Sequence, residues 1–227
     1  MEKSKFFTIV ITIIVAAAIL ITLINIIFDN SKINQGDFRV SDTIISSIVK
    51  LEDKSENENG WTFDVSQSNK VSMLIASNSN TKIKEVYIDK VHVTSKKNVN
   101  IYIEQEKYNT SYSYSDIKNK KVNIYTEEKE NGNYLVEFDV LNKNIMKDYM
   151  VPDEIKEIRY DGTILNLAGI AVSDITFDLK YNLVIAEEKG QINTCNIKIK
   201  MPDKKIATEG LSVERLSNQN FNFKVDY

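Results

Sequence analysis

The stretch ITFDLKYNLVI, residues 175–185, alternates apolar and polar side chains along its length, broken only by Val184 near its end. Because neighbouring side chains of a β-strand point to opposite faces, this pattern predicts a long strand with one buried face. The same alternation recurs over shorter lengths at 61–65, 99–103, 122–124, 134–140, 195–201 and 221–227. The pattern therefore predicts strands for most of the chain beyond its N-terminal segment.

Turn residues separate these runs. Asp161-Gly162 predicts a two-residue hairpin turn that joins 158–160 to 163–165. Asn131-Gly132 and Glu188-Lys189-Gly190 predict two further turns between apolar runs. Hairpins of this kind pair their strands antiparallel, so the expected sheet is antiparallel.

Irregularities in the pattern are few. Between Lys82 and Thr94 the alternation changes phase after Ile83 and again after Ile88, which predicts two bulges or bends. The best short helix candidate lies at 42–51. Closely spaced strands without intervening helices predict an all-β fold, an antiparallel β-sandwich or jelly-roll-like domain.

The N-terminal segment has a different character. The 23 residues that begin with Phe6 and end with Phe28 contain no charged side chain. As a helix they would be roughly 34 Å long, enough to cross a hydrocarbon core of about 30 Å. Ala16-Ala17-Ala18, the one cluster of small residues, lies in the middle of the run, so we expect an uncleaved single-pass anchor in the lipid bilayer.

Charge asymmetry predicts the orientation of this anchor. Lys3, Lys5 and the N-terminal amine precede it, whereas Asp29 and Lys32 follow it, which favours a cytoplasmic N-terminus. We therefore expect residues 1–5 in the cytoplasm, a membrane anchor at 6–28, a tether at 29–37 and an extracytoplasmic domain at 38–227. A division of that domain into two lobes near 149–153, around Pro152, is the alternative.

Composition limits the function. The chain of 227 residues has a formal net charge of −3 and a single cysteine, so it has no intramolecular disulfide. A mildly acidic chain is a poor ligand for nucleic acid, which requires clustered Lys and Arg. No sequence motif for a metal, a cofactor or a catalytic triad is present. We expect no cofactor and no nucleic-acid partner.

The predicted binding residues are Tyr108, Tyr112 and Tyr114. They lie in the segment YNTSYSYSD, residues 108–116, where Ser, Asn and Thr separate the tyrosines. Tyr offers a large contact area and a free hydroxyl, which suits a surface that binds protein or glycan. The alternative is an edge strand that carries Tyr112 and Tyr114 on one face.

Other residues gave weaker candidates. His92 and Cys195 are the only residues of their types, and we expect a surface strand residue and a buried small hydrophobe, respectively. The acidic stretch 53–64 resembles a calcium loop, but Glu58 stands where the sharp-turn glycine should be. Carboxylates at 127–130 and 187–188 are expected at hairpin ends.

These features suggest a membrane-anchored surface protein. An apolar N-terminal helix followed by an exported all-β domain, in a chain rich in Asn and Lys, is similar in layout to surface and matrix proteins of Gram-positive bacteria. We expect a bacterial cell-surface protein whose domain binds a partner without catalysis. The alternatives are a subunit of an extracellular fibre or biofilm matrix, assembled by strand addition, and a carbohydrate-active enzyme with paired carboxylates.

Overall fold

A computed structural model describes most of the predicted domain. Residues from Gly36 to the C-terminus form one compact unit. The predicted cytoplasmic residues 1–5 and anchor 6–28 lie outside the described residues, and no helix within the described ranges is long and apolar enough to cross a membrane. The described residues are 35–57, 60–77, 81–129, 132–151, 163–216 and 221–226.

The described residues form twelve strands that belong to one antiparallel sheet. These strands are β1 (Gln35–Asn57), β2 (Gly60–Ser77), β3 (Ile83–Ser95), β4 (Ile101–Gln105), β5 (Thr110–Ser113), β6 (Val122–Asn123), β7 (Tyr125–Glu128), β8 (Asn133–Met150), β9 (Phe177–Glu187), β10 (Ile192–Met201), β11 (Leu211–Arg215) and β12 (Asn222–Asp226). The short helices are η1 (Glu106–Tyr108), α2 (Tyr114–Ile117), α3 (Thr163–Leu167), α4 (Val172–Ile175) and α5 (Ile206–Glu209). Because β1 begins at Gln35, it includes the last three residues of the predicted tether.

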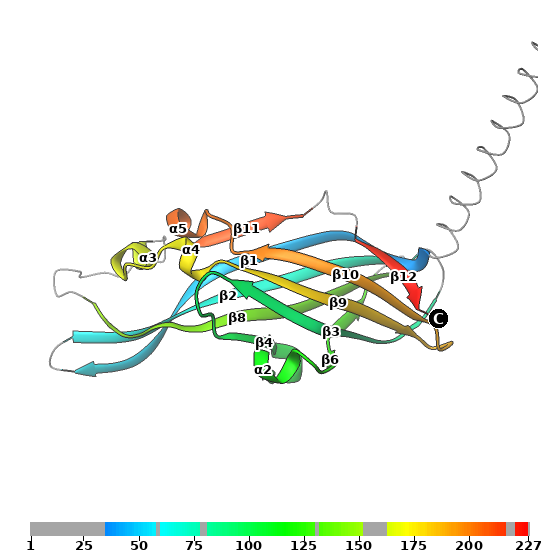
Figure 1. Ribbon diagram of the computed structural model, residues 1–227, viewed down its shortest axis with the longest axis horizontal. Helices are drawn as coiled ribbons and strands as arrows, with labels where there is room; N and C mark the ends of the chain where they lie inside the picture. Colours follow the sequence, from blue (N-terminus) through cyan, green and yellow to red (C-terminus); the bar gives the residue numbers. More distant parts are fainter. Residues whose placement is uncertain are drawn as a thin grey trace, which may run out of the picture. The chain divides into compact units, whose positions relative to one another are not determined.

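The all-β prediction is confirmed, but the described strands form one curled sheet where a sandwich would have two separate sheets (Figure 1). The order is β5-β4-β8-β2-β1-β12-β10-β9-β3-β6, with β11 beside β1 and β7 beside β8. The curl follows from the connection between β6 and β7, which only Ile124 separates. Strand β6 pairs with β3 and β7 pairs with β8, so this segment joins distant parts of the sheet.

The inner face of the curl encloses the main apolar core. The apolar residues of the alternating stretch 175–185 lie in β9 and face this core, where Phe177, Leu179, Tyr181 and Leu183 are buried. Tyr181 meets Phe138 of β8 edge to face, with ring centroids 5.7 Å apart. Such pairs add to the stabilisation that burial provides. The strands predicted at 134–140 and 195–201 contribute in the same way, so the period-two pattern is confirmed there.

Two local predictions in the strands are confirmed. The pairing of β3 with β9 shifts register between Ile83 and Glu85 and between Asp89 and His92, where the alternation changes phase. The turn at 188–190 joins β9 to β10, and Gly190 there adopts a φ of 92°, which glycine permits at no steric cost.

The helix candidate at 42–51 is wrong, because these residues lie within β1. Thr43, Ile45, Ser47 and Val49 point inward and are buried, whereas Ile44 on the outer face is 39% exposed. Hydroxyl side chains thus occupy positions where the period-two pattern expects apolar residues. Because of these hydroxyl residues, the period-two pattern did not predict β1, a strand of 23 residues.

The strand predicted at 163–165 is also wrong, because these residues open α3. Ile164, Leu165 and Ala168 are buried in a second apolar core, which packs against Val49 of β1 and Val65 of β2. Helix spacing places these three side chains on one face. The other half of the predicted hairpin, 158–162, lies outside the described residues. Figure 1 shows α3, α4 and α5 gathered at one end of the sheet.

A buried polar layer separates the two cores. Ser47, Gln67, Asn69 and Asn142 come from β1, β2 and β8, and each is at most 2% exposed. The Gln67 side chain donates to Asn69 Oδ1 at 2.7 Å, and Asn69 Nδ2 donates to the Val140 carbonyl at 2.9 Å. Along each strand, these residues lie between those of the main core and those of the second core.

Candidate ligand-binding cavity

The candidate site begins with two bulges in β8. Its pairing with β2 shifts register between Val65 and Gln67, opposite residues 143–145, and again between Phe63 and Val65. Asn144 and Asp148 adopt φ values of 54° and 52° there. Non-glycine residues in this region are strained by about 1–3 kcal/mol, and bulges often re-aim side chains at functional sites.

Side chains of β2 hold these bulges in place. The Ser66 hydroxyl accepts a hydrogen bond from the Asn144 amide at 3.1 Å, and Asp64 Oδ1 accepts one from the Asp148 amide at 2.9 Å. The Lys143 amide donates to the Asn100 carbonyl at 2.9 Å, which ties the first bulge to the segment before β4. The bulged strand is therefore fixed on both sides.

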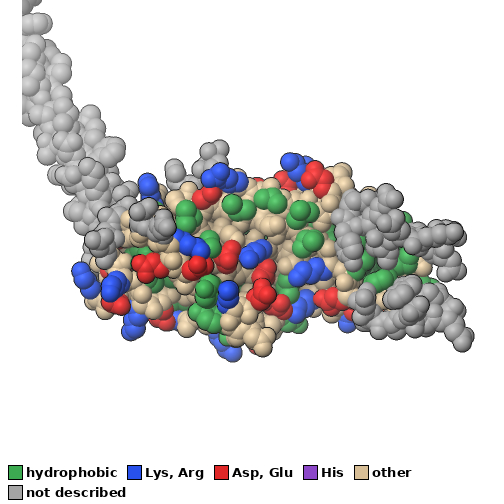
Figure 2. All heavy atoms as spheres, turned by 180° about the vertical axis from the view of Figure 1, so that it is seen from behind, with side chains coloured by type: hydrophobic (Ala, Val, Ile, Leu, Met, Phe, Trp, Pro, Cys, Tyr) green, Lys and Arg blue, Asp and Glu red, His purple; other side chains and the backbone are tan. Residues whose placement is uncertain are grey.

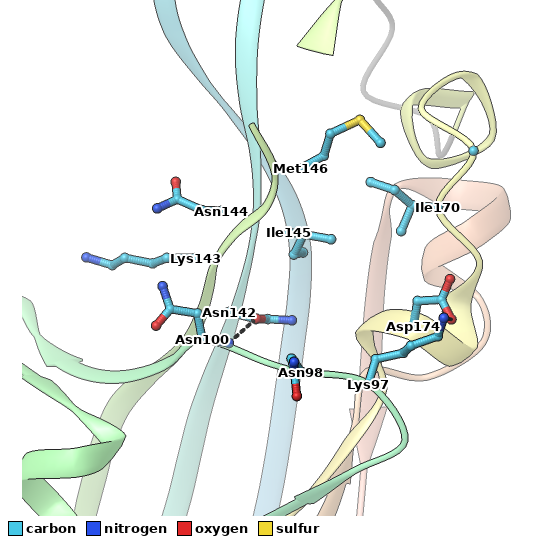
Figure 3. A pocket seen from close by; sticks show the side chains of 11 residues that line it. Lys97, Asn98, Asn100, Asn142, Lys143, Asn144, Ile145, Met146, Ile170 and Asp174 are labelled. Carbon is cyan, nitrogen blue, oxygen red and sulfur yellow. Dashed lines mark hydrogen bonds and ion pairs between the residues drawn. The ribbon is translucent and has the colours of Figure 1, made fainter. Parts of the chain in front are cut away.

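A cavity of about 430 Å³ lies beside the first bulge. Volumes of this order accommodate small ligands or part of a peptide. The side chains of Asn100, Lys143 and Asn144 lie on one side of β8, whereas Ile145, Met146 and Ile170 point toward one another on the other side (Figure 3). The remaining lining residues are Lys97, Asn98, Asn142, Gly169 and Asp174.

Asn142 supplies a donor to this cavity. The residue is 2% exposed, and its Oδ1 accepts a hydrogen bond from the Asn100 amide at 3.0 Å. Its amide nitrogen has no hydrogen-bond partner among the described residues and points toward the side of the cavity where Ile145 and Asn98 lie (Figure 3). An amide nitrogen carries two N–H donors, so this group can donate to a ligand or water in the cavity.

The charges around the cavity are paired. Lys97 Nζ lies 3.9 Å from Asp174 Oδ1. Lys143 forms an ion pair with Glu104, and its ammonium also lies 4.7 Å from the centre of the Tyr102 ring. A ligand in this cavity therefore meets amide groups and aliphatic surface, and every charged side chain among the described lining residues has a partner. This arrangement suits an uncharged ligand.

The predicted tyrosines do not converge. Tyr108 is 53% exposed and meets Tyr125 edge to face, with ring centroids 5.8 Å apart. Tyr112 on the edge strand β5 is 38% exposed. Tyr114 is partly buried against the main core, and its hydroxyl accepts a hydrogen bond from the Val93 amide at 3.4 Å. Among the described residues, no ring contact joins the three.

The weaker candidates have these positions. His92 is exposed on β3, opposite Lys180 of β9. Cys195 is 1% exposed in the main core, and burial raises the pKa of its thiol to about 12. A thiol with that pKa is a poor nucleophile.

The acidic candidates lie in strands and at hairpin ends. The part of 53–64 that the structure describes belongs to the paired strands β1 and β2, and the described residues hold no cluster of metal-ligating side chains. Glu127 forms an ion pair with Lys129. Glu187 is 3% exposed and accepts a hydrogen bond from Asn193 Nδ2 at 2.7 Å.

The asparagines of the cavity were not predicted from the sequence. Asn98 and Asn100 form one Asn-x-Asn pair, and Asn142 and Asn144 form a second. The repeated pair is the one sequence signal that points to them, but Asn is common throughout this chain. Only the pairing of β4 with β8 shows that the two pairs are neighbours, since Ile101 lies opposite Asn142.

Surface charge is mixed on the face that Figure 2 shows. Lys and Arg side chains are interspersed with Asp and Glu, and small groups of apolar side chains lie between them. This distribution agrees with the small net charge of −3. That face offers no broad basic surface for a phosphate backbone.

Comparison with known proteins gives no relative. No protein-family model matches the chain, and neither a curated protein nor a solved structure matches it.

Proposed function

We propose that this chain is a membrane-anchored bacterial cell-surface protein whose β-domain binds an uncharged segment of another protein without catalysis. The observation that carries the proposal is the side-chain amide of Asn142, whose nitrogen faces the cavity beside the aliphatic group of Ile145, Met146 and Ile170. A peptide offers complementary groups, namely backbone carbonyls for the amide and apolar side chains for the aliphatic surface.

The cavity favours a peptide over a glycan. Among the described residues that line it, none is aromatic, and an aromatic ring would provide a flat face for a sugar ring. Met146 adapts to side chains of different shape, since its thioether chain is unbranched and flexible. The pairing of Lys97 with Asp174 and of Lys143 with Glu104 favours an uncharged segment.

Display at the cell surface is supported by the sequence. The uncharged run 6–28 is long enough to span a bilayer, and the charges before it favour a cytoplasmic N-terminus. Protease added to intact protoplasts should digest the β-domain and leave a membrane-bound stub. Digestion only after lysis would contradict the orientation, and a mature protein that begins after Phe28 would contradict the retained anchor.

One observation favours assembly into a fibre as a second function. Within the described residues, β11 pairs with β1 alone, so its other edge faces no strand. Val213 of β11 is 60% exposed. An open edge with apolar side chains can accept a strand from a second chain. Concentration-dependent self-association that Val213→Lys abolishes would support this alternative.

Peptide selection tests the main proposal. A phage-displayed library of random peptides is panned against the full chain in nanodiscs and then against Asn98→Trp, which places a large ring at the cavity. The matched control is Asn222→Trp, at an exposed position of β12. We expect enriched uncharged peptides that bind the wild type and the control but not Asn98→Trp.

Two results would overturn this proposal. Enriched peptides that bind Asn98→Trp as tightly as the wild type would place the contact elsewhere. Soluble oligosaccharides of N-acetylglucosamine that bind the wild type and the control but not Asn98→Trp would assign the cavity to glycans instead.

A further inference from the structure

A second hollow also borders α4, at Val172 and Ser173, whereas the Asn-lined cavity borders it at Asp174. Its volume is about 640 Å³, which is also within the range of ligand sites. Buried Phe177 and Pro202 line it, together with partly exposed Val172 and Ala207. These four side chains come from β9, from the chain after β10, from α4 and from α5. We call this hollow the apolar groove.

Three lysines line the same groove. Lys96 follows β3, Lys200 is the penultimate residue of β10, and Lys204 precedes α5; all three are exposed. Within the described part of the chain, none of them forms an ion pair. This differs from the Asn-lined cavity, where both lysines have acidic partners.

Among the described residues, one carboxylate lines the groove, and it has a cationic partner. Asp178 of β9 lies opposite Lys200 of β10 and Thr94 of β3. Its Oδ2 lies 3.4 Å from Lys198 Nζ, so Lys198 offsets its charge. The lining therefore keeps a net positive charge although the whole chain has a net charge of −3.

One further lysine extends the positive charge along the outer face of the sheet. Lys180 of β9 lies in the next row across the strands, between His92 of β3 and Lys198 of β10. Cations that surround an apolar surface attract anions from solution and bind them best when an apolar group is attached.

We propose that the apolar groove binds a small free amphiphile with an alkyl chain and one anionic headgroup, either carboxylate or phosphate. The alkyl chain lies against the partly exposed Val172 and Ala207 and against Pro202. The headgroup lies among Lys96, Lys200 and Lys204. Charge complementarity selects the anion, and burial of the alkyl chain supplies the remaining affinity.

The probes are octanoate and octyl phosphate, titrated calorimetrically into the full chain in nanodiscs, with empty nanodiscs as the blank. We expect saturable binding of at least one probe, at one site per chain. Acetate, inorganic phosphate and 1-octanol each lack one half of the amphiphile, so each should bind at least about tenfold more weakly. Raising the salt concentration should weaken binding of the anionic probes.

Variants locate the site. Replacing Lys96, Lys200 and Lys204 together by Gln should weaken binding about tenfold, since each exposed ion pair contributes a small amount. The matched control replaces Lys118, Lys120 and Lys189 by Gln, which are exposed and lie outside the groove. The control should change the affinity less than about twofold.

A pair of single variants keeps the test decisive if the triple variant does not fold. Ser173 is exposed and lines the groove, so Ser173→Glu should weaken binding and Ser173→Lys should not. Equal affinities for both variants, or for the triple variant and the wild type, would overturn the proposal. Acetate or 1-octanol binding as tightly as octanoate would also overturn it.

Discussion

Alkaline pH provides a quantitative test of how deeply Cys195 is buried. The side chain is 1% exposed, and burial raises the pKa of its thiol from 9.0 to about 12 in the folded state. Between these two values the unfolded chain loses the proton and the folded chain keeps it. The free energy of unfolding therefore falls as the pH rises. This decrease begins near pH 9 and is complete near pH 12.

The size of the loss follows from the two pKa values. At pH 8 the unfolded thiol is mostly protonated, so the free energy of unfolding falls by only about 0.1 kcal/mol. At pH 10 the loss is about 1.4 kcal/mol, and at pH 12 it approaches about 4 kcal/mol. Tyr and Lys side chains also titrate in this range, but they are present in a Cys195→Ala variant as well. The difference between wild type and variant isolates the thiol.

The assay is urea unfolding of residues 36–227 at pH 8 and pH 10, followed by circular dichroism with a non-thiol reductant. The free energy of unfolding of the wild type relative to Cys195→Ala should fall by about 1.4 kcal/mol between the two pH values. A relative free energy of unfolding that does not change would refute the burial argument. Rapid labelling of the native thiol at pH 8 would refute it too, and would reopen Cys195 as a nucleophile.

Three further substitutions test the packing, each by urea or thermal unfolding. Phe177→Ala should lower the free energy of unfolding by about 3–5 kcal/mol, because the ring is 1% exposed in the main core. A decrease of less than about 1 kcal/mol would contradict the burial of this ring. Gly36→Ala should cost about 1–3 kcal/mol, because the new Cβ would lie 2.3 Å from Asn193 Oδ1; an unchanged melting temperature would show that β1 shifts freely. Tyr114→Ser should lower the free energy of unfolding by about 2 kcal/mol, because that side chain packs on the core. Tyr112→Ser should change the free energy of unfolding by less than about 0.5 kcal/mol, because that side chain is exposed. Equal effects of the two substitutions would refute the assigned orientations.

The strands that sequence predicts best are those with one apolar face. In β9, Phe177, Leu179, Tyr181 and Leu183 all face the core, so the period-two pattern identifies both the strand and its buried side. The bulges of β3 were predictable for the same reason, since each extra residue reverses the pattern. Burial of alternate apolar side chains leaves a local signal, which a single sequence carries.

A strand whose inner face mixes polar and apolar residues gave no such signal. Strand β1 turns Thr43 and Ser47 inward and Ile44 outward, so the pattern there is neither that of a strand nor that of a helix. The single curled sheet depends on β6 and β7 pairing with distant strands, which no local pattern reports. The Asn-lined cavity was not predicted for a similar reason, because Asn98 and Asn142 are brought together only when β4 pairs with β8.

The buried polar layer formed by Ser47, Gln67, Asn69 and Asn142 divides the interior into two regions that do not share apolar contacts across it. Ser47 Oγ and Gln67 Oε1 have no hydrogen-bond partner among the described side chains, so this layer stabilises the fold less than apolar packing would. The helical end and the large curl can therefore exchange their amide hydrogens at separate rates, as two cooperative folding units. Both proposed ligand sites border α4 at the helical end, so a ligand bound at either site should slow amide exchange there more than in the main core.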